Sequence, residues 1–242
     1  WVGDFDDDGR PDVVVPGDSM FWFKNNGNWN FTKNYIGYWD HRTDINACDV
    51  GDVDNDGDLD IVAGIRPLLL WRNNGDMTFV PESITEGRRW RAKLGDLNND
   101  SYLDLLATDQ VYLNPGPGNP GVFSDPPDWD AGFPSGTVDG NWIADFDGDN
   151  IRDLLLCSQW PITGLAPAIS WYENDSNGTS YTPHEIVTGG MAKAHGDAAI
   201  AEDMDLDGRT DVVGGYSRIG YFHQYPLGEF TLVTVDSSFG GS

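Results

Sequence analysis

The chain is poor in basic residues and in long apolar segments. It has 14 Lys and Arg against 40 Asp and Glu, which gives a formal net charge of -26 at pH 7. Nucleic-acid binding needs a basic surface that neutralises phosphates, so this charge excludes a nucleic-acid partner. No apolar run approaches the ~20 residues of a membrane-spanning helix, and we therefore expect no membrane span. The 242 residues suffice for one all-β domain or two ordinary ones.

Cysteine is scarce as well. Cys48 and Cys157 lie in repeats that are not neighbours, so we expect two buried thiols rather than a disulfide. They do not report on the redox compartment. The sequence begins at Trp1 without an initiator Met or a signal peptide, which is typical of a mature form or an excised domain.

Aspartate is abundant, and much of it falls in a nine-residue frame that occurs five times. Acids or Asn occupy positions 1, 3, 5 and 9, and an apolar strand follows at once, as in Asp52–Asp60 followed by Ile61–Ala63. The residues at these four positions are Asp4, Asp6, Asp8 and Asp12; Asp52, Asp54, Asp56 and Asp60; Asp96, Asn98, Asp100 and Asp104; Asp145, Asp147, Asp149 and Asp153; and Asp203, Asp205, Asp207 and Asp211.

This frame predicts five calcium sites. Calcium takes six to eight oxygens, and alternate residues of a tightly curled loop point inward, so positions 1, 3 and 5 converge on one ion. The carboxylate at position 9 and the carbonyl at position 7 would complete the ligand set. The residues at position 7 are Arg10, Asp58, Tyr102, Ile151 and Arg209. The last acid stands at 9 rather than 12 and a strand follows, which argues against an EF-hand; magnesium, which keeps its waters, fits less well.

Solvated acidic turns are the alternative, because Asp, Asn and Gly are common turn residues. Five copies in one register favour the metal, since clustered carboxylates repel one another without a cation. The third site is expected to be the weakest, because Asn98 replaces an acid and Ser101 replaces the glycine at position 6. Asn150 at the same position of the fourth loop tolerates a left-handed backbone better than serine does.

The loops begin at residues 4, 52, 96, 145 and 203, a period of about 50 residues that is typical of propellers and solenoids. No segment has a sustained helical period, and four short strands per repeat with a recurring aromatic indicate a propeller blade. We therefore predict an all-β, five-bladed β-propeller with four antiparallel strands and one calcium loop per blade. It would form a single domain over 1–242, with blades near 1–44, 45–90, 91–138, 139–194 and 195–242. A five-repeat fragment of a longer propeller is the alternative.

Within each repeat, an aromatic-rich third strand precedes a fourth strand that carries one aromatic residue. The third strands are expected at 20–23, 68–71, 111–113, 169–172 and 220–222. The fourth strands are expected to centre on Phe31, Phe79, Phe123, Tyr181 and Phe230.

The signature Asp-x-Asp/Asn-x-Asp-Gly-x-x-Asp resembles the FG-GAP/VCBS β-propeller repeats, the calcium-loop blades also seen in integrin α-subunit heads. The similarity covers all five repeats, and segments such as Gly51–Asp60 and Trp171–Asn174 are similar to the secreted microbial branch. It implies calcium in the loop between the first two strands of each blade, and ligands on the opposite face of the disc. Family members include adhesion heads, lectins and catalytic domains of polysaccharide lyases, so the fold does not settle the function.

The loops expected on that opposite face combine Arg with Trp and His in a chain that is otherwise acidic. Arginine binds carboxylate or sulfate through two parallel bonds, and indole rings offer flat faces to sugars, which favours an acidic glycan or an acidic protein ligand. The alternative is that the arginines balance nearby acids and the tryptophans pack the blades. The candidate ligand residues are Trp39, His41, Arg42, Arg88, Arg89, Trp90, Arg91, Trp129, Trp160, His195 and Arg218.

The sequence therefore predicts an extracellular, secreted or cell-surface propeller that is stabilised by calcium and binds carbohydrate, preferably acidic glycans, without catalysis. Two alternatives stay open: a structural subunit of an extracellular filament or larger surface protein, and a polysaccharide lyase. His41 or His195 with a nearby Arg could serve a lyase. No base, acid and neutraliser are fixed together by the sequence, so an enzyme is less favoured and no catalytic residue is assigned. Extracellular calcium is millimolar and would fill even weak sites.

Overall fold

The structure is a computed structural model of the 242-residue chain. It describes residues 1–17, 19–38, 48–64, 67–87, 89, 91–133, 138–158, 169–187, 199–215 and 219–234.

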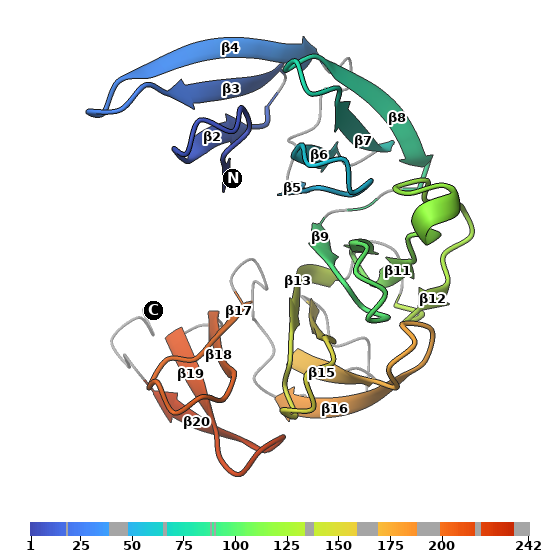
Figure 1. The fold of residues 1–242 in the computed structure, drawn as a ribbon. Helices are drawn as coiled ribbons and strands as arrows, with labels where there is room; N and C mark the ends of the chain where they lie inside the picture. Colours follow the sequence, from blue (N-terminus) through green and yellow to red (C-terminus); the bar gives the residue numbers. More distant parts are fainter. Residues whose placement is uncertain are drawn as a thin grey trace, which may run out of the picture. The chain divides into compact units, whose positions relative to one another are not determined.

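The described residues form five four-stranded sheets, in each of which consecutive strands are neighbours (Figure 1). The first sheet contains β1 (Val2–Gly3), β2 (Asp12–Val15), β3 (Ser19–Asn25) and β4 (Phe31–Tyr38). The second contains β5 (Cys48–Gly51), β6 (Asp60–Gly64), β7 (Leu68–Asn73) and β8 (Phe79–Thr85). The third contains β9 (Ala92–Gly95), β10 (Asp104–Ala107), β11 (Gln110–Tyr112) and β12 (Trp129–Asp130). The fourth contains β13 (Val138–Ala144), β14 (Asp153–Ser158), β15 (Ile169–Asn174) and β16 (Tyr181–Val187). The fifth contains β17 (Ala199–Glu202), β18 (Asp211–Gly215), β19 (Ile219–Gln224) and β20 (Phe230–Thr234).

This arrangement confirms the predicted fold class, an all-β chain whose five antiparallel sheets are the blades of a propeller. The only helix among the described residues is η1, a short 3-10 turn over Gly116–Gly118. The described residues therefore contain no helix that is long and apolar enough to cross a membrane. Cys48 and Cys157 are both buried and unpaired with each other, as the sequence predicts.

One strand prediction is wrong. The fourth strand of the third sheet does not centre on Phe123; it is the short β12, in which Trp129 pairs with Val111 of β11. Phe123 lies in an irregular segment, 8% exposed, and packs into the core from there. The physical reason is the proline content of the segment from Pro115 to Pro127, since proline cannot donate a ladder hydrogen bond. In the other four sheets the predicted aromatic is the first residue of the fourth strand rather than its centre.

The second strand of each sheet explains the apolar runs that follow the acidic loops. In the second, third and fourth sheets the three residues after the last aspartate are at most 2% exposed, so both faces of these strands are buried. In the first sheet only one face is buried: Val14 is fully buried whereas Val15 is 44% exposed. In the fifth sheet, Val212 is fully buried and Val213 is half-buried. A strand buried on both faces has a continuous apolar sequence instead of an alternating one.

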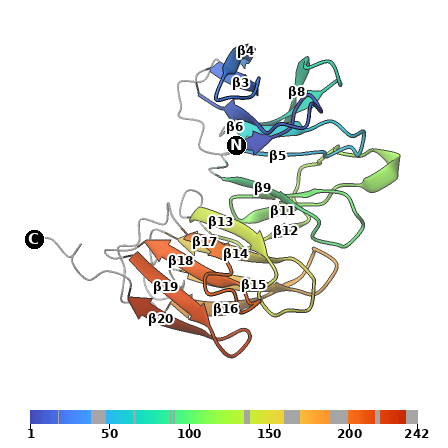
Figure 2. The same ribbon diagram turned by 60° about the vertical axis from the view of Figure 1, so that its left-hand side comes forward.

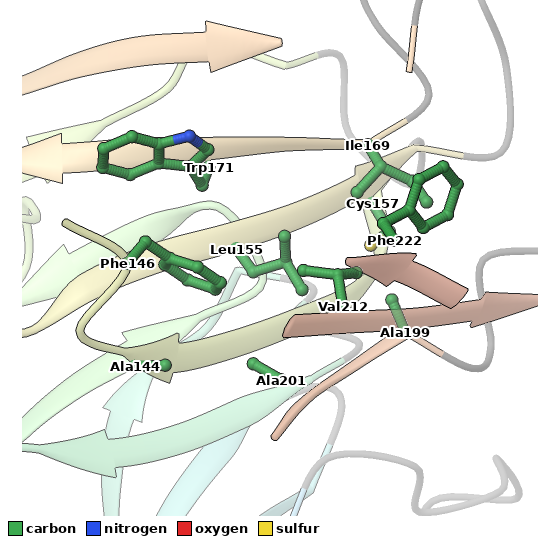
Figure 3. Close-up of a cluster of buried hydrophobic side chains, with 10 residues drawn as sticks. All are labelled: Ala144, Phe146, Leu155, Cys157, Ile169, Trp171, Ala199, Ala201, Val212 and Phe222. Atoms are coloured by element: carbon green, nitrogen blue, oxygen red, sulfur yellow. The ribbon is translucent and has the colours of Figure 1, made fainter. Parts of the chain in front are cut away.

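The chain divides into two compact units, and the division passes through the third sheet. Unit 1 comprises 1–94, 101–107 and 112–126, and unit 2 comprises 95–100, 108–111 and 127–242. In unit 2, β13 of the fourth sheet lies beside β17 of the fifth, as Figures 1 and 2 both show. The side chains of these two sheets form one apolar cluster that includes Phe146, Leu155, Trp171 and Phe222 (Figure 3). Two corresponding clusters lie in unit 1.

A buried amide side chain links each of the last three sheets to the sheet before it. Asn114 donates to the carbonyl of Val53 at 2.7 Å, Asn174 to that of Leu97 at 2.7 Å, and Gln224 to that of Phe146 at 2.5 Å. Each donor stands at or just after the end of a third strand, and each acceptor is position 2 of the preceding sheet's acidic loop. The bond therefore fixes one loop against the next sheet.

Replacing Asn174 should test this link. Asn174 is 3% exposed, and its amide also donates to the carbonyl of Arg152 while its oxygen accepts from the N–H groups of Ser176 and Gly178. Asn174→Ala leaves these buried backbone groups unpaired and should lower the free energy of unfolding by about 3 kcal/mol. Asn34→Ala, which removes one exposed bond to the carbonyl of Thr32, should cost under about 1 kcal/mol in the same urea titration. Equal losses would contradict the link.

Candidate metal-binding loops

The five acidic frames are the loops that join the first and second strands of the five sheets. The loop of the second sheet runs from Asp52, just after β5, to Asp60, the first residue of β6. The other four occupy the same place in their sheets, as the family resemblance implies. Each loop therefore begins at the end of one strand and ends inside the next, so strand pairing fixes both of its ends.

The backbone of every loop is left-handed at positions 4 and 6. In the second loop Asn55 has φ 57° and Gly57 has φ 100°. Position 6 is the one that the sequence singled out through its glycine; position 4 was missed, because in the other loops it is Asp7, Asn99, Gly148 and Leu206. At position 6 of the third loop, Ser101 has φ 71°, a conformation that costs a residue with a Cβ about 1–2 kcal/mol.

The carboxylate at position 1 organises the loop from inside. In the second loop the Oδ1 atom of Asp52 accepts the N–H of Asp56 at 3.1 Å and its Oδ2 atom accepts the N–H of Gly57 at 3.0 Å. The first and fifth loops repeat both bonds. The position-5 carboxylate then accepts the N–H of position 7, as in the 2.9 Å bond from Asp58 to Asp56. These bonds hold the loop curled around its first carboxylate.

The carboxylate at position 9 is buried in all five loops, at 0–1% exposure. In each sheet its Oδ1 atom accepts a backbone N–H from the end of the third strand, at 2.7 to 2.9 Å; the donors are Asn25, Asn73, Asn114, Asn174 and Gln224. In four loops its Oδ2 atom accepts the N–H of position 2; these donors are Phe5, Val53, Phe146 and Met204. One carboxylate thus joins the loop to the second and third strands.

The position-3 carboxylates of the first two loops each keep one oxygen buried and without a hydrogen bond. These atoms are Oδ1 of Asp6 and Oδ1 of Asp54. The outer oxygen of Asp6 pairs with Lys24, and the outer oxygen of Asp54 lies 2.7 Å from Nη1 of Arg72. A buried oxygen that bears charge and has no donor is costly, and a cation in the loop would satisfy it. The residues present therefore fit a bound metal ion.

Burial also disfavours the ionised state of several loop carboxylates. It raises the pKa of Asp60 and that of Asp153 to about 7, even though backbone N–H donors lower both values. Burial raises the pKa of Asp54 as well, and the neighbouring Asp56 adds to the rise while Arg72 opposes it. A divalent cation would offset both the cost of burying these carboxylates and the repulsion between Asp54 and Asp56.

Five groups of three side chains bring their ligand atoms within 4.8 Å of one another. They are Asp4, Asp6 and Asp8; Asp52, Asp54 and Asp60; Asp145, Asp147 and Asp153; Asp203, Asp205 and Asp211; and Asp205, Asp207 and His223. The first, second, fourth and fifth loops thus hold clusters that could bind a metal ion, and the fifth of these loops holds two such clusters. Among the described residues, the third loop supplies no such group, in keeping with Asn98 at its position 3.

Sequence reasoning missed the side chains that reach these loops from the third strand. Lys24, Arg72 and His223 each stand one residue before the Asn or Gln whose N–H bonds the buried aspartate. The signal was present, because this position is fixed relative to the end of each third strand. It carries a different residue in every repeat, so no repeated motif marks it.

Most of the candidate ligand residues lie outside the described residues: Trp39, His41, Arg42, Arg88, Trp90, Trp160, His195 and Arg218. Of the rest, half-buried Arg89 donates to the hydroxyl of Tyr112 at 3.2 Å. Trp129 packs against Tyr172 and Tyr181, with ring centroids 5.6 and 4.5 Å away. Trp129 thus has the packing role that the sequence left open, and a ligand role for this set stays a prediction.

The chain belongs to the family of FG-GAP-like repeat proteins. The family model matches residues 4–63 and 145–214, which together are more than half of the chain and include the first, second, fourth and fifth loops. A sequence comparison with curated proteins gave no significant match.

Two solved structures resemble the fold. One is an Agrocybe aegerita lectin that specifically recognises non-reducing terminal N-acetylglucosamine; it is 21% identical, with a TM-score of 0.69. The alignment covers 100% of this chain and 66% of the lectin, so this chain spans just under two thirds of the lectin's length. The other is the V. cholerae biofilm matrix protein Bap1, 14% identical with a TM-score of 0.47, of which 41% is covered against 98% of this chain. At these identities the lectin supports the fold alone.

The third loop offers a direct test of backbone strain. Ser101→Gly removes the Cβ that a left-handed residue tolerates poorly and should raise the free energy of unfolding by about 1 kcal/mol. Ser83→Gly, in the middle of β8 and outside the left-handed region, should instead lower it by roughly 0.5–1 kcal/mol. Chemical denaturation of both variants without added metal measures the difference. A loss in both would show that Ser101 carries no strain.

Proposed function

We propose that this protein is a calcium-stabilised, extracellular propeller that binds carbohydrate without catalysis. Two observations support the proposal. The unpartnered inner oxygens of Asp6 and Asp54 favour a cation in the loops, and the fold is similar to that of a lectin. The first observation bears on the metal and the second on the ligand class, so the two parts are tested separately.

Calcium is the ion that the loops favour, because every side-chain ligand in the first four loops is an oxygen and the loops curl around several carboxylates. Positions 1, 3, 5 and 9 would supply carboxylate or amide oxygens, with the carbonyl of position 7 as a further ligand. When bound, calcium would neutralise these carboxylates and fix the hairpin between the first two strands. The protein's part is to orient the oxygens, through backbone N–H donors and through Lys24 and Arg72 outside the loop.

The calcium proposal predicts a loss of one ion from a defined site. Asp54→Asn keeps the shape of the side chain but removes its negative charge and its ion pair with Arg72, and should reduce bound calcium by one equivalent in isothermal titration. The control is Asp76→Asn, because Asp76 is an exposed acid in a turn and bonds only Thr78. Chelation should lower the melting temperature of the wild-type protein and of the control alike. A melting temperature that is indifferent to chelation and to added calcium would overturn the calcium role.

For the carbohydrate, we favour an acidic glycan bound by the arginine-rich loops. Arg89 and Arg91 are half-buried and lie directly before β9, beside the further candidates Arg88 and Trp90 in the sequence. Guanidinium groups bind carboxylate and sulfate through paired, charge-assisted hydrogen bonds. A neutral glycan with terminal N-acetylglucosamine is the second candidate, because the similar lectin recognises that sugar.

A glycan panel in millimolar calcium distinguishes these candidates. Uronate and sulfated glycans should be retained, and Arg91→Gln should weaken their binding about tenfold, the effect of one charge-assisted bond. The control Lys33→Gln removes an exposed cation that stacks on Phe21 in the first sheet and should leave binding unchanged. Capture of N-acetylglucosamine-terminated glycans alone would keep a lectin but reject the role of the arginines. Absence of binding to every glycan would reject the carbohydrate function and favour a structural subunit.

A further inference from the structure

The fifth acidic loop differs from the other four in the side chain that covers it. Lys24, Arg72, Leu113, Glu173 and His223 occupy corresponding positions in the five sheets, one residue before the Asn or Gln that bonds the buried aspartate. Lys24 and Arg72 bring fixed positive charges to their loops. Glu173 turns instead to His184, at 2.7 Å. Among the described residues, only in the fifth sheet does this position bring a metal-ligating atom within 4.8 Å of the loop carboxylates.

The imidazole of His223 lies among the carboxylates of its loop. Its Nδ1 atom is 3.4 Å from Oδ2 of Asp205 and 3.5 Å from Oδ1 of Asp211. Asp205, Asp207 and His223 each bring a ligand atom within 4.8 Å of the other two, and this is the one group among the described residues that combines nitrogen with oxygen. The 3.4 Å spacing of His223 and Asp205 suits coordination, because two ligand atoms about 2.1 Å from one ion stand roughly 3.4 Å apart at a tetrahedral angle.

Neighbouring side chains hold the ring in this position. Tyr225 lies parallel to it, with an interplanar angle of 4° and centroids 6.3 Å apart. The hydroxyl of Tyr221 is 2.9 Å from Oδ2 of Asp211 and 3.2 Å from Nδ1 of His223. Nδ1 of His223 therefore faces the hydroxyl of Tyr221 together with the carboxylates of Asp205 and Asp211.

Asp207 is oriented as well. Its outer oxygen pairs with the guanidinium of Arg209, and its Oδ1 atom accepts the backbone N–H of Arg209 at 2.9 Å. Arg209 in turn lies over the ring of Tyr225, 5.1 Å from its centroid, and donates to the carbonyl of Gln224 at 3.0 Å. The group of three is therefore held in place from both sides.

We propose that the fifth loop is a site for a zinc-class transition-metal ion, with His223 as its nitrogen ligand and Asp205 and Asp207 as oxygen ligands. Imidazole binds zinc, cobalt and nickel well but is a poor ligand for calcium, which takes oxygen. The inference rests on the proposed binding of divalent cations by these loops and assigns this one a different ion. The competing interpretation is that a protonated His223 is only a fixed cation, equivalent to Lys24 and Arg72.

Cobalt(II) is the probe, because its visible absorption reports nitrogen ligation and its paramagnetism broadens nearby proton resonances. Metal-free protein is first saturated with calcium and then titrated with CoCl2, and with ZnCl2 in competition. The wild-type protein should bind one equivalent of cobalt that zinc displaces, and the imidazole resonances of His223 should broaden before those of His184. His223→Lys, which installs the residue of the first sheet, should weaken cobalt binding at least tenfold.

His184→Gln is the matched control, because His184 contacts one carboxylate, Glu173, and stacks on Trp171 outside any acidic loop. It should bind cobalt as the wild type does. Undiminished cobalt binding in His223→Lys, or no cobalt binding by the wild type, would overturn the proposal in favour of the fixed-cation interpretation. His223→Gln and the resonance broadening in the wild type serve if the lysine variant does not fold.

The result is separable from the calcium proposal. The protein could fail to bind cobalt while calcium still raises its melting temperature. That result would reject the fifth-loop site alone and leave the calcium proposal intact. Cobalt binding at His223 without any calcium effect would reject the calcium role and keep this site.

Discussion

Each sheet depends on one buried carboxylate, the aspartate at position 9 of its acidic loop. In the fourth sheet, Asp153 accepts the N–H of Asn174 at 2.8 Å with one oxygen and the N–H of Phe146 at 2.9 Å with the other. A 1%-exposed carboxylate is tolerable only when such donors surround it. It therefore fixes the end of the third strand and the start of the loop relative to the second strand. The same residue begins that strand, so the acidic loop and the apolar core form one unit of structure.

The same loops combine structural hydrogen bonds with carboxylate oxygens that could hold a metal ion. Asp52 curls the second loop through backbone N–H groups, and Arg72 turns the outer oxygen of Asp54 away from the interior, which leaves the inner oxygen buried and unpartnered. Hydrogen bonds of this kind around a ligand orient it and raise its affinity for the ion. Burial raises the pKa of Asp60, and the neighbouring charge of Asp54 adds to the rise, so a cation in the loop would favour the ionised carboxylate. A cation that binds in these loops would therefore couple its binding to folding.

The features that recur in every repeat could be predicted from the sequence, whereas the residues that differ between repeats could not. The five loops, the strands that follow them and the aromatic third strands recur with a constant period, so one sequence carried five observations of each. Phe123 was placed in a strand because its aromatic character matched the repeat, although the prolines between Pro115 and Pro127 break the ladder there. The cations at Lys24 and Arg72 were missed because their relation to the loop is made by strand pairing, 18 residues from Asp6 and Asp54. Which arginines and tryptophans meet on a ligand face depends on loop geometry that no period encodes.

Two adjacent residues at the end of each third strand behave differently: the second is nearly constant among the five sheets, and the first varies. The second of them, Asn73 in the second sheet and Gln224 in the fifth, always gives its N–H to the buried aspartate and is an amide residue in every sheet. The first takes no part in that bond, so it can change without loss of the fold. Lys24, Arg72 and His223 at this position each contact the acidic loop of their own sheet. A repeat protein can in this way keep five equivalent scaffolds while giving each loop its own charge and its own ligand atoms. Part of the electrostatic difference between the loops is therefore set by a residue outside the acidic frame, and comparison of the frames alone does not reveal that part.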